Sequence, residues 1–209
     1  MKTWFTSDLH LGHEKVADHR GFASTDEHDT VILGNLHAAL DRGDHLWILG
    51  DISSGTNRSE RNALDKLNEL TRTNTLHLIA GNHDSCHPMR TDAFARRSMY
   101  EQVFVSVQPY ARRRLPDGVG KVWLSHLPFH GAGDREPGVE RYPEVRLHDD
   151  GNDWIMHGHL HTPGKVSGPR SLHIGLDAWD LKPVWWEAAA TLITRLHVND
   201  PLHAPVVPA

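Results

Sequence analysis

Residues that can bind metal ions or transfer protons occur in this chain directly after short apolar stretches. Asp8 and His10 follow the first such stretch, Asp51 follows the second, and the run Gly81–Asp84 follows the third. Carboxylate oxygens, imidazole nitrogens and amide oxygens are all ligands of divalent ions, and such a site needs no thiolate. Each motif taken alone is equally typical of a polar turn, because Gly, Asn and Asp are ordinary turn residues.

Histidines repeat this pattern later in the chain. His126 ends another apolar stretch, and His159 and His161 follow one more. His159 and His161 are two residues apart, as are Asp8 and His10, so each pair can point to one side of an extended chain and chelate one ion. A purification tag would also be rich in histidine, but a tag is terminal and uninterrupted, whereas this cluster lies in mid-chain.

The run Gly81–Asp84 brings three different polar groups together in one turn. Asn82 supplies a neutral amide oxygen that can bind a metal, and His83 supplies a group that titrates near neutrality. Asp84 supplies a carboxylate that could orient the imidazole of His83. These types suit a site in which one residue holds an ion and its neighbour moves a proton.

Hydrophobic periodicity predicts the elements that position these residues. Short strands are predicted at 3–6, 45–49 and 75–80, and they alternate with amphipathic helices at 27–40 and 60–70. Ligands collect at the carboxyl ends of strands in such sheets, so the polar tips of the three strands should converge. Alternating residues then predict a second sheet with antiparallel strands at 103–107 and 120–124, followed by a strand at 154–156 and a helix at 187–196.

Length and composition fit one domain with a sizeable core. We predict a single domain over residues 1–196 and a Pro-containing tail over residues 197–209. The net charge of -5 argues against a general electrostatic grip on nucleic acid or on anionic membranes, although it leaves a local basic patch open. The single cysteine, Cys86, and the lack of a signal-peptide or membrane-helix pattern indicate a reducing, cytoplasmic location and no membrane partner.

Taken in order, the motifs resemble those of the calcineurin-like metallophosphoesterases. The set consists of D-x-H at Asp8–His10, G-D at Gly50–Asp51, G-N-H-D at Gly81–Asp84, a lone His126 and G-H-x-H at Gly158–His161. The resemblance continues to about Val184 through a closing strand near residues 172–177. It implies an α/β fold, a four-layer αββα sandwich in which two mixed β-sheets are flanked by helices.

The same resemblance implies a dinuclear metal centre. The ligands would be divided between two ions, with Asp8, His10 and His161 for the first and Asn82, His126 and His159 for the second. Asp51 would bridge both ions, of which Mn²⁺ is favoured and Fe, Zn, Ni or Co are alternatives. Such a pair of ions activates a shared water for in-line attack on phosphorus. By resemblance His83 is no ligand but stabilises the transition state or protonates the leaving oxygen, and Asp84 is a weaker candidate for orienting it.

The motifs define a reaction, hydrolysis of a phosphate ester, rather than one substrate. We expect a small phosphodiester or nucleotide-like substrate, with a phosphomonoesterase as the alternative and nucleic acid disfavoured. A non-catalytic scaffold would usually have lost ligands, and none is missing here. A protein that only stores metal gives no reason for the Asn82-His83 pair. The sequence leaves the oligomeric state open.

Selectivity is expected in the long segment 129–150, which has no clear periodicity. It carries Arg135, Arg141 and Arg146, any of which could meet a second phosphate, although scattered arginines in a loop are usually solvated.

The other histidines and the tryptophans have simpler interpretations. His13 and His157 lie beside ligands and are expected to hydrogen-bond or face solvent rather than coordinate. Ten others are expected at the surface or its boundary, namely His19, His28, His37, His45, His77, His87, His130, His148, His173 and His197. Four tryptophans in apparent strands are expected in the core, namely Trp4, Trp47, Trp123 and Trp154.

Overall fold

The computed structural model describes residues 1–116, 118–134 and 139–198. Arg135 and the chain from residue 199 onward, which includes most of the predicted tail, lie outside these residues. His197 and Val198 belong to the last helix, so regular structure continues two residues beyond the predicted domain end.

The first sheet carries the three strands predicted in the first half of the chain. Its strands are β1 (Thr3–Thr6), β2 (His45–Ile48), β3 (Thr75–Ile79), β4 (Ser106–Gln108) and β10 (Val184–Trp185). They lie in the order β10-β1-β2-β3-β4, where β1 to β4 are parallel and β10 is antiparallel. The predicted strand at 103–107 was therefore assigned to the wrong sheet, because β4 pairs with β3 in the parallel direction.

The second sheet contains β5 (Tyr110–Arg114), β6 (Lys121–Ser125), β7 (Trp154–His157), β8 (Val166–Gly168) and β9 (Ser171–His173). Their order is β5-β6-β7-β9-β8, with parallel pairing from β6 through β9 and antiparallel strands at both edges. The antiparallel partner of β6 is β5, which the sequence did not reveal. Its arginine-rich residues lack an apolar face because the strand lies exposed at the edge.

The helices are α1 (Glu14–His19), α2 (Thr25–Ala39), α3 (Asn57–Asn68), α4 (Ala93–Tyr100) and α5 (Trp186–Val198). Side-chain caps fix two of their starts, since Ser24 accepts from the backbone of Glu27 and Thr56 accepts from that of Ser59. Three short 3₁₀ turns, at Leu70–Arg72, Pro143–Val145 and Leu176–Ala178, complete the regular structure of the described residues.

Alternation along the strands of the first sheet produces two cores. Leu46, Ile48 and Leu78 point to one face and pack with residues of α2 and α3. On the other face Phe5, Leu49 and Ile79 meet apolar residues of the second sheet, and Ala189 and Ile193 of α5 join the same cluster. The first core joins the helices to the first sheet, whereas the second joins the two sheets to each other.

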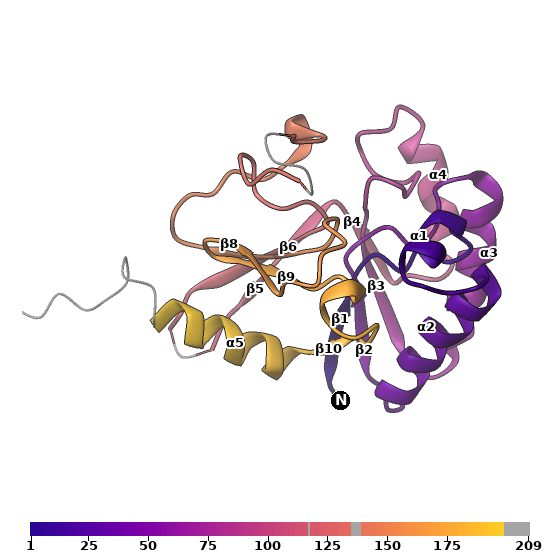
Figure 1. The fold of residues 1–209 in the computed structure, drawn as a ribbon, viewed down its shortest axis with the longest axis horizontal. Coiled ribbons are helices and arrows are strands. Elements are labelled where there is room, and N and C mark those ends of the chain that lie inside the picture. Colours follow the sequence, from indigo (N-terminus) through magenta and orange to yellow (C-terminus); the bar gives the residue numbers. More distant parts are fainter. Residues whose placement is uncertain (117, 135–138, 199–209) are drawn as a thin grey trace, which may run out of the picture.

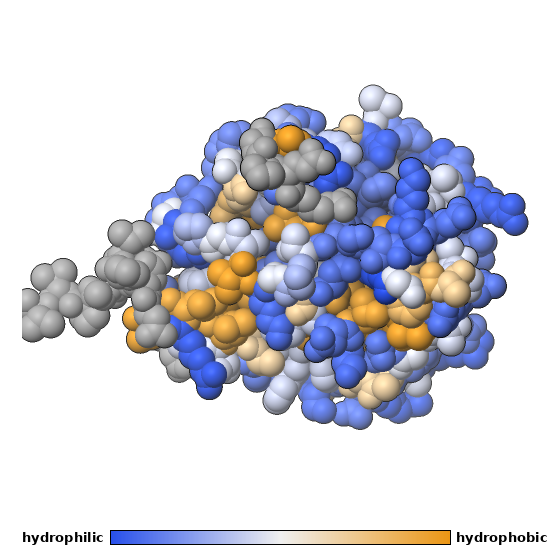
Figure 2. Space-filling model, in the orientation of Figure 1, coloured by the Kyte–Doolittle hydropathy of each residue, from blue (hydrophilic) through white to orange (hydrophobic). Residues whose placement is uncertain are grey.

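The predicted fold class is confirmed, because two mixed sheets pack together with flanking helices. The helices are divided unequally between the two sheets, because α1 to α4 lie beside the first sheet and α5 lies beside the second (Figure 1). Polar residues cover most of the face in Figure 2, apart from apolar areas that include one beside α5. In the described part of the chain, every helix is too short or too polar to cross a membrane.

Candidate metal centre

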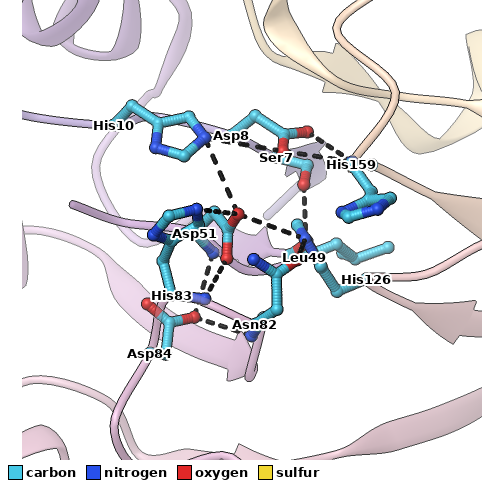
Figure 3. A network of polar contacts seen from close by, with 12 residues as sticks. Ser7, Asp8, His10, Leu49, Asp51, Asn82, His83, Asp84, His126 and His159 are labelled. Carbon is cyan, nitrogen blue, oxygen red and sulfur yellow. Dashed lines mark hydrogen bonds and ion pairs between the residues drawn. The ribbon is translucent and has the colours of Figure 1, made fainter. Parts of the chain in front are cut away.

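The predicted ligands follow strands from both sheets and meet between them. Asp8, Asp51 and Asn82 come after the parallel strands β1, β2 and β3, so their backbones emerge at the same sheet edge. His126 and His159 come after β6 and β7 of the second sheet. Figure 3 shows these side chains turned toward a common centre, with Asp51 in the middle.

The backbone at these ligands is unusual. Left-handed conformations with positive φ occur at five of the predicted ligands, namely Asp8 (61°), His10 (46°), Asp51 (56°), His159 (71°) and His161 (50°). A non-glycine residue in this conformation costs about 1–2 kcal/mol, and such strain persists only where surrounding contacts enforce it. Backbone hydrogen bonds enforce it here: Asp8 N–H donates to Gly50 and His10 N–H donates to Asp51, both at 3.0 Å.

Two glycines allow the strand ends to approach this closely. A Cβ atom on Gly81 would lie 2.6 Å from the backbone nitrogen of Asp51 and against its Oδ1 atom. A Cβ atom on Gly158 would overlap Ser7 and Asp8. The glycines of the G-N-H-D and G-H-x-H motifs are therefore required sterically, because they let one ligand-bearing turn pack on another.

The first cluster consists of Asp8, His10 and His161. The Nε2 atoms of His10 and His161 lie 3.1 Å apart, and Oδ1 of Asp8 lies 3.9 Å and 3.6 Å from them. Asp8 is fully buried and His10 is 1% exposed. Nδ1 of His10 faces the carbonyl of Ser53 at 3.1 Å.

The second cluster consists of Asp51, His126 and His159, with Asn82 beside it. Nε2 of His126 lies 3.3 Å from Oδ2 of Asp51 and 3.1 Å from Oδ1 of Asn82. Nδ1 of His126 faces the carbonyl of Leu49 at 2.7 Å. All seven predicted ligands are thus brought together, in the two groups expected.

Asp51 lies between the two clusters. Its Oδ2 atom is 3.6 Å from Nε2 of His10 and 3.3 Å from Nε2 of His126, so one oxygen faces both groups. Its Oδ1 atom accepts a hydrogen bond from the backbone of His83 at 2.8 Å. The bridging role of Asp51 stays a prediction, and it requires one oxygen that faces both groups.

The donor set fits a pair of divalent ions. In His10 and His161 the Nδ1 atom already has an oxygen acceptor, the carbonyl of Ser53 or the carboxylate of Asp177, which leaves Nε2 without its proton. Two lone pairs then face each other at 3.1 Å in a buried site, an arrangement that a cation between them relieves. Burial also lowers the pKa of His10 to about 3, which keeps this imidazole neutral and ready to coordinate.

The charges of Asp51 and His126 depend on each other. Burial alone would lower the pKa of His126, but the attraction of Asp51 outweighs it and raises this pKa to about 9. Burial would likewise raise the pKa of Asp51, yet His126 and His10 lower it overall. Without an ion, the two residues therefore form a buried charged pair, and an ion at this position must displace the proton of His126.

The structure contradicts the expectation that Asp84 orients His83. The carboxylate of Asp84 instead accepts hydrogen bonds from the backbone N–H groups of Gly81, Asp51 and Ile52, at 2.7 to 3.1 Å. Burial and the nearby charge of Asp51 raise the pKa of Asp84 to about 7. Asp84 therefore ties the turns after β2 and β3 together.

The imidazole of His83 contacts the carbonyl of Ser54 rather than the carboxylate of Asp84. This carbonyl lies 3.1 Å from Nδ1 of His83, while Nε2 of the same ring lies 4.0 Å from Oδ2 of Asp51. The side chain of His83 is 35% exposed, in contrast to the buried ligands. This placement at the edge of the site suits a residue that meets substrate rather than one that holds an ion.

Two supporting residues were missed from the sequence. Oδ2 of Asp177 lies 3.1 Å from Nδ1 of the ligand His161, and Arg20 donates to both oxygens of Asp177 at 2.8 Å. Arg20 also donates to the carbonyl of the ligand Asp8 at 2.9 Å. Asp177 ends the stretch that resembles the closing strand, which was a weak signal, whereas Arg20 directly follows α1 and stands in no recognisable motif.

Three histidines expected near the surface are buried. His28 and His173 have no exposed surface and His87 is 6% exposed. Each finds an internal contact: His28 pairs with Asp29, His87 accepts from the backbone of Met89, and His173 stacks on His157. A lone histidine in the sequence carries no sign of such partners, so its burial was not predictable.

His13 and His157 behave as expected of residues that lie beside ligands. The ring centroids of His13 and His10 lie 5.2 Å apart. His157 hydrogen-bonds the hydroxyl of Ser167 and the carbonyl of Gly158. Of the tryptophans expected in the core, Trp154 is buried, but Trp4, Trp47 and Trp123 are only partly buried.

Two arginines of segment 129–150, which were expected to be solvated, make internal contacts. Arg146 has a fully buried side chain, and Nη2 of Arg141 lies 2.9 Å from Nε2 of the ligand His159. Asp134, which drew no attention in the sequence, lies 2.9 Å from the same nitrogen.

Known proteins are similar to this chain in sequence or in fold. The family model of the calcineurin-like phosphoesterases matches residues 1–163, so the chain belongs to this family. The Gene 66 protein of Mycobacterium phage L5 is 37% identical over 210 residues, which cover 96% of this chain and 98% of that protein. The Gene 66 protein of Mycobacterium phage D29 is 43% identical over 188 residues, covering 87% and 91%.

Among solved structures, a protein of unknown function from Aquifex aeolicus has a similar fold. Its TM-score is 0.67 at 23% identity, and the match covers 91% of this chain and 98% of that one. Family membership and the two clusters of His and Asp indicate a metal-dependent phosphoesterase with a dinuclear site.

Proposed function

We propose that the protein hydrolyses a small phosphodiester or nucleotide-like ester at a dinuclear centre, with Mn²⁺ as the favoured metal. The observation that carries this proposal is the position of Asp51, whose Oδ2 atom faces His10 of one cluster and His126 of the other. The two ions would be held by Asp8, His10 and His161 on one side and Asn82, His126 and His159 on the other, with Asp51 shared. When bound, such a pair supplies an activated water and neutralises charge on the phosphate oxygens.

His83 is proposed to assist the leaving group. Its ring is held by the carbonyl of Ser54 through Nδ1, which makes Nδ1 the protonated nitrogen of a neutral ring and directs Nε2 toward the site. With its side chain 35% exposed, Nε2 can reach an ester oxygen that enters from solvent. When the ring also carries a proton on Nε2, that proton would pass to the departing oxygen, which leaves the neutral ring with its proton on Nδ1 and avoids the release of an unstable alkoxide.

A cavity of about 420 Å³ supports a substrate with a sizeable, polar leaving group. It lies between α2 and α3 and is lined by Ser54, the residue that holds His83, together with Thr56, Arg58 and Lys66. Ser54 connects the two features, because it contacts His83 and also lines this polar cavity. A diester, which carries an organic group on each side of phosphorus, uses this space better than a monoester with a small alcohol.

A phosphomonoesterase is the second candidate, and Arg141 favours it. Its guanidinium lies beside His159, and its side chain is 40% exposed. A permanent positive charge in this region would suit the dianionic phosphate of a monoester. We further propose a cytoplasmic location, in keeping with the free thiol of Cys86.

Hydrolysis of two chromogenic substrates tests the proposal. We expect purified protein to hydrolyse bis-p-nitrophenyl phosphate with a higher kcat/KM than p-nitrophenyl phosphate when Mn²⁺ is present, and to lose activity on chelation. A preference for the monoester would support the second candidate. If the protein binds two ions and hydrolyses neither ester, a non-catalytic scaffold would replace both.

A further inference from the structure

The two halves of the metal centre are supported by different parts of the chain. In the first half, the predicted ligand His161 contacts Asp177, which Arg20, the residue directly after α1, holds through two hydrogen bonds. In the second half, the ligand His159 contacts Asp134, which lies between β6 and β7 in segment 129–150. Each half thus has its own carboxylate behind a histidine, but the two carboxylates come from unrelated elements.

Asp134 is buried and held firmly. Its side chain is 3% exposed, and its Oδ1 atom lies 2.9 Å from Nε2 of His159 and accepts from Nη2 of Arg146 at 2.9 Å. Its Oδ2 atom accepts from the backbone N–H of Arg141 at 2.8 Å and from Nε of the same residue at 3.1 Å. Arg146, whose side chain is fully buried, also donates to the carbonyls of Arg141 and Gly133. These bonds fix the carboxylate where it meets His159.

Nε2 of His159 faces a donor as well as an acceptor. Oδ1 of Asp134 and Nη2 of Arg141 both lie 2.9 Å from it. A neutral imidazole carries one N–H, so Nε2 can either donate to Asp134 or accept from Arg141, but not both. Donation to Asp134 leaves Nδ1 with a lone pair for an ion, whereas acceptance from Arg141 puts the proton on Nδ1 and blocks coordination.

The geometry favours donation to Asp134. Whichever tautomer forms, one of the two contacts is unfavourable and must be relieved by movement. Arg141 has a 40% exposed side chain that can turn into solvent, whereas Asp134 is 3% exposed and is tied to the buried Arg146. The bond from His159 to the buried carboxylate is also the stronger of the two. Water can replace His159 as the acceptor of the exposed Arg141 guanidinium.

We propose that Asp134 is a positioning residue for the second ion: it holds His159 as the Nε2–H tautomer, so that Nδ1 is the nitrogen offered to the metal. The proposal rests on the dinuclear centre proposed above. Asp134 then supports the second half-site, while Arg20 and Asp177 support the first, so the two ions can be lost separately.

Metal titration of two variants tests this separation. By calorimetry on chelator-treated protein, Asp134→Asn should keep the affinity of one Mn²⁺ and weaken the other by about 10- to 100-fold, the usual effect of removing a carboxylate behind a ligating histidine. Asp177→Asn should weaken one ion to a similar extent, and the double variant should weaken both. Asp149→Asn is the matched control, because Asp149 lies in the same segment and pairs with Arg170.

The titration separates the possible failures. Wild-type protein that binds no pair of ions would overturn the dinuclear centre itself. If wild-type protein binds two ions and both affinities in Asp134→Asn lie within twofold of the wild-type values, only the role of Asp134 would be overturned. Equal weakening in Asp149→Asn would also overturn it, because any charge change in the segment would then suffice.

A measurement on the unmodified protein avoids any loss of folding in the variants. Two-bond ¹H–¹⁵N spectra of histidine-labelled, metal-free protein report which nitrogen carries the proton, and His159→Gln identifies the signal by its disappearance. We expect the Nε2–H pattern for His159. The Nδ1–H pattern would show that Arg141 rather than Asp134 determines the tautomer, and would overturn the proposal.

Discussion

Oδ2 of Asp51 lies 3.6 Å from Nε2 of His10 and 3.3 Å from Nε2 of His126, so a single oxygen serves both clusters. The other ligands each belong to one cluster. Single substitutions at these residues should therefore differ in how many ions they affect, and this difference can be measured apart from activity.

Asp51→Asn should weaken both ions. The amide keeps an oxygen that can accept from the backbone of His83, but it lacks the negative charge that one oxygen shares between two cations. We expect each affinity to fall by at least about 100-fold, since even residues behind a ligand are worth 10- to 100-fold. Metal analysis after gel filtration checks this, and a variant that retains both ions would exclude a bridging role.

His83→Ala should lower kcat while leaving the metal content unchanged. The ring lies at the exposed edge of the site and is proposed to donate a proton, a contribution worth about 10²- to 10⁴-fold. His13→Ala removes a neighbouring ring, 6.0 Å from His83, and serves as the matched control. A His83→Ala protein that has lost metal would show that His83 is a ligand instead.

The ligands could be predicted from the sequence, whereas their supports could not. Asp8, His10 and the others stand in short motifs with fixed spacing, and the spacing alone suggests chelation. Arg20 reaches Asp177 across 157 residues, and Asp134 reaches His159 from a segment without periodicity. Such pairings depend on how the two sheets pack, which no local pattern records.

At the scale of elements, the parallel strands and their glycines determine how closely the ligands approach. The sequence predicted the alternation of strands and helices in the first half, because each strand is apolar on both faces and each helix has one apolar face. It failed at β4 and β5, which have three and five residues. The first pairs in an unexpected sheet, and the second shows an exposed, arginine-rich face.

Gly81→Ala should disrupt the centre without a change of charge. Its Cβ atom would lie 2.6 Å from the backbone nitrogen of Asp51, so the turns after β2 and β3 must separate. Weaker binding of both ions and a lower Tm are expected. Gly34→Ala is the matched control, because a Cβ atom there meets nothing within 4 Å and alanine favours the helix by about 1 kcal/mol. Normal metal binding by Gly81→Ala would contradict the close approach.

At the level of the whole molecule, a titratable residue lies beside the core between the two sheets, where it contacts the partly buried Trp47. His77 of β3 is half-buried, stacks on Trp47 and hydrogen-bonds Ser106 and His45. Burial, and then the proximity of His45, lower the pKa of His77 to about 4. A folded-state pKa below the unfolded value of about 6.5 means that acid destabilises the fold.

His77→Gln should make metal-free protein less sensitive to acid. The stabilisation from neutral His77 is fully present above pH 6.5 and is lost as pH falls from 6.5 toward 4, with a slope of at most about 1.4 kcal/mol per pH unit. Glutamine cannot titrate, so the free energy of unfolding of the variant should fall less between pH 7 and pH 4.5 than that of the wild-type protein. Urea denaturation at both values checks this, and equal losses in the two proteins would exclude His77 as a contributor.

The most direct test of the metal centre is anomalous diffraction from crystals grown with Mn²⁺. We expect two manganese peaks about 3.5–4 Å apart, one bound by Asp8, His10 and His161 and the other by Asn82, His126 and His159, with Asp51 touching both. A single peak, peaks away from these residues, or an Asp51 side chain that contacts only one ion would contradict it.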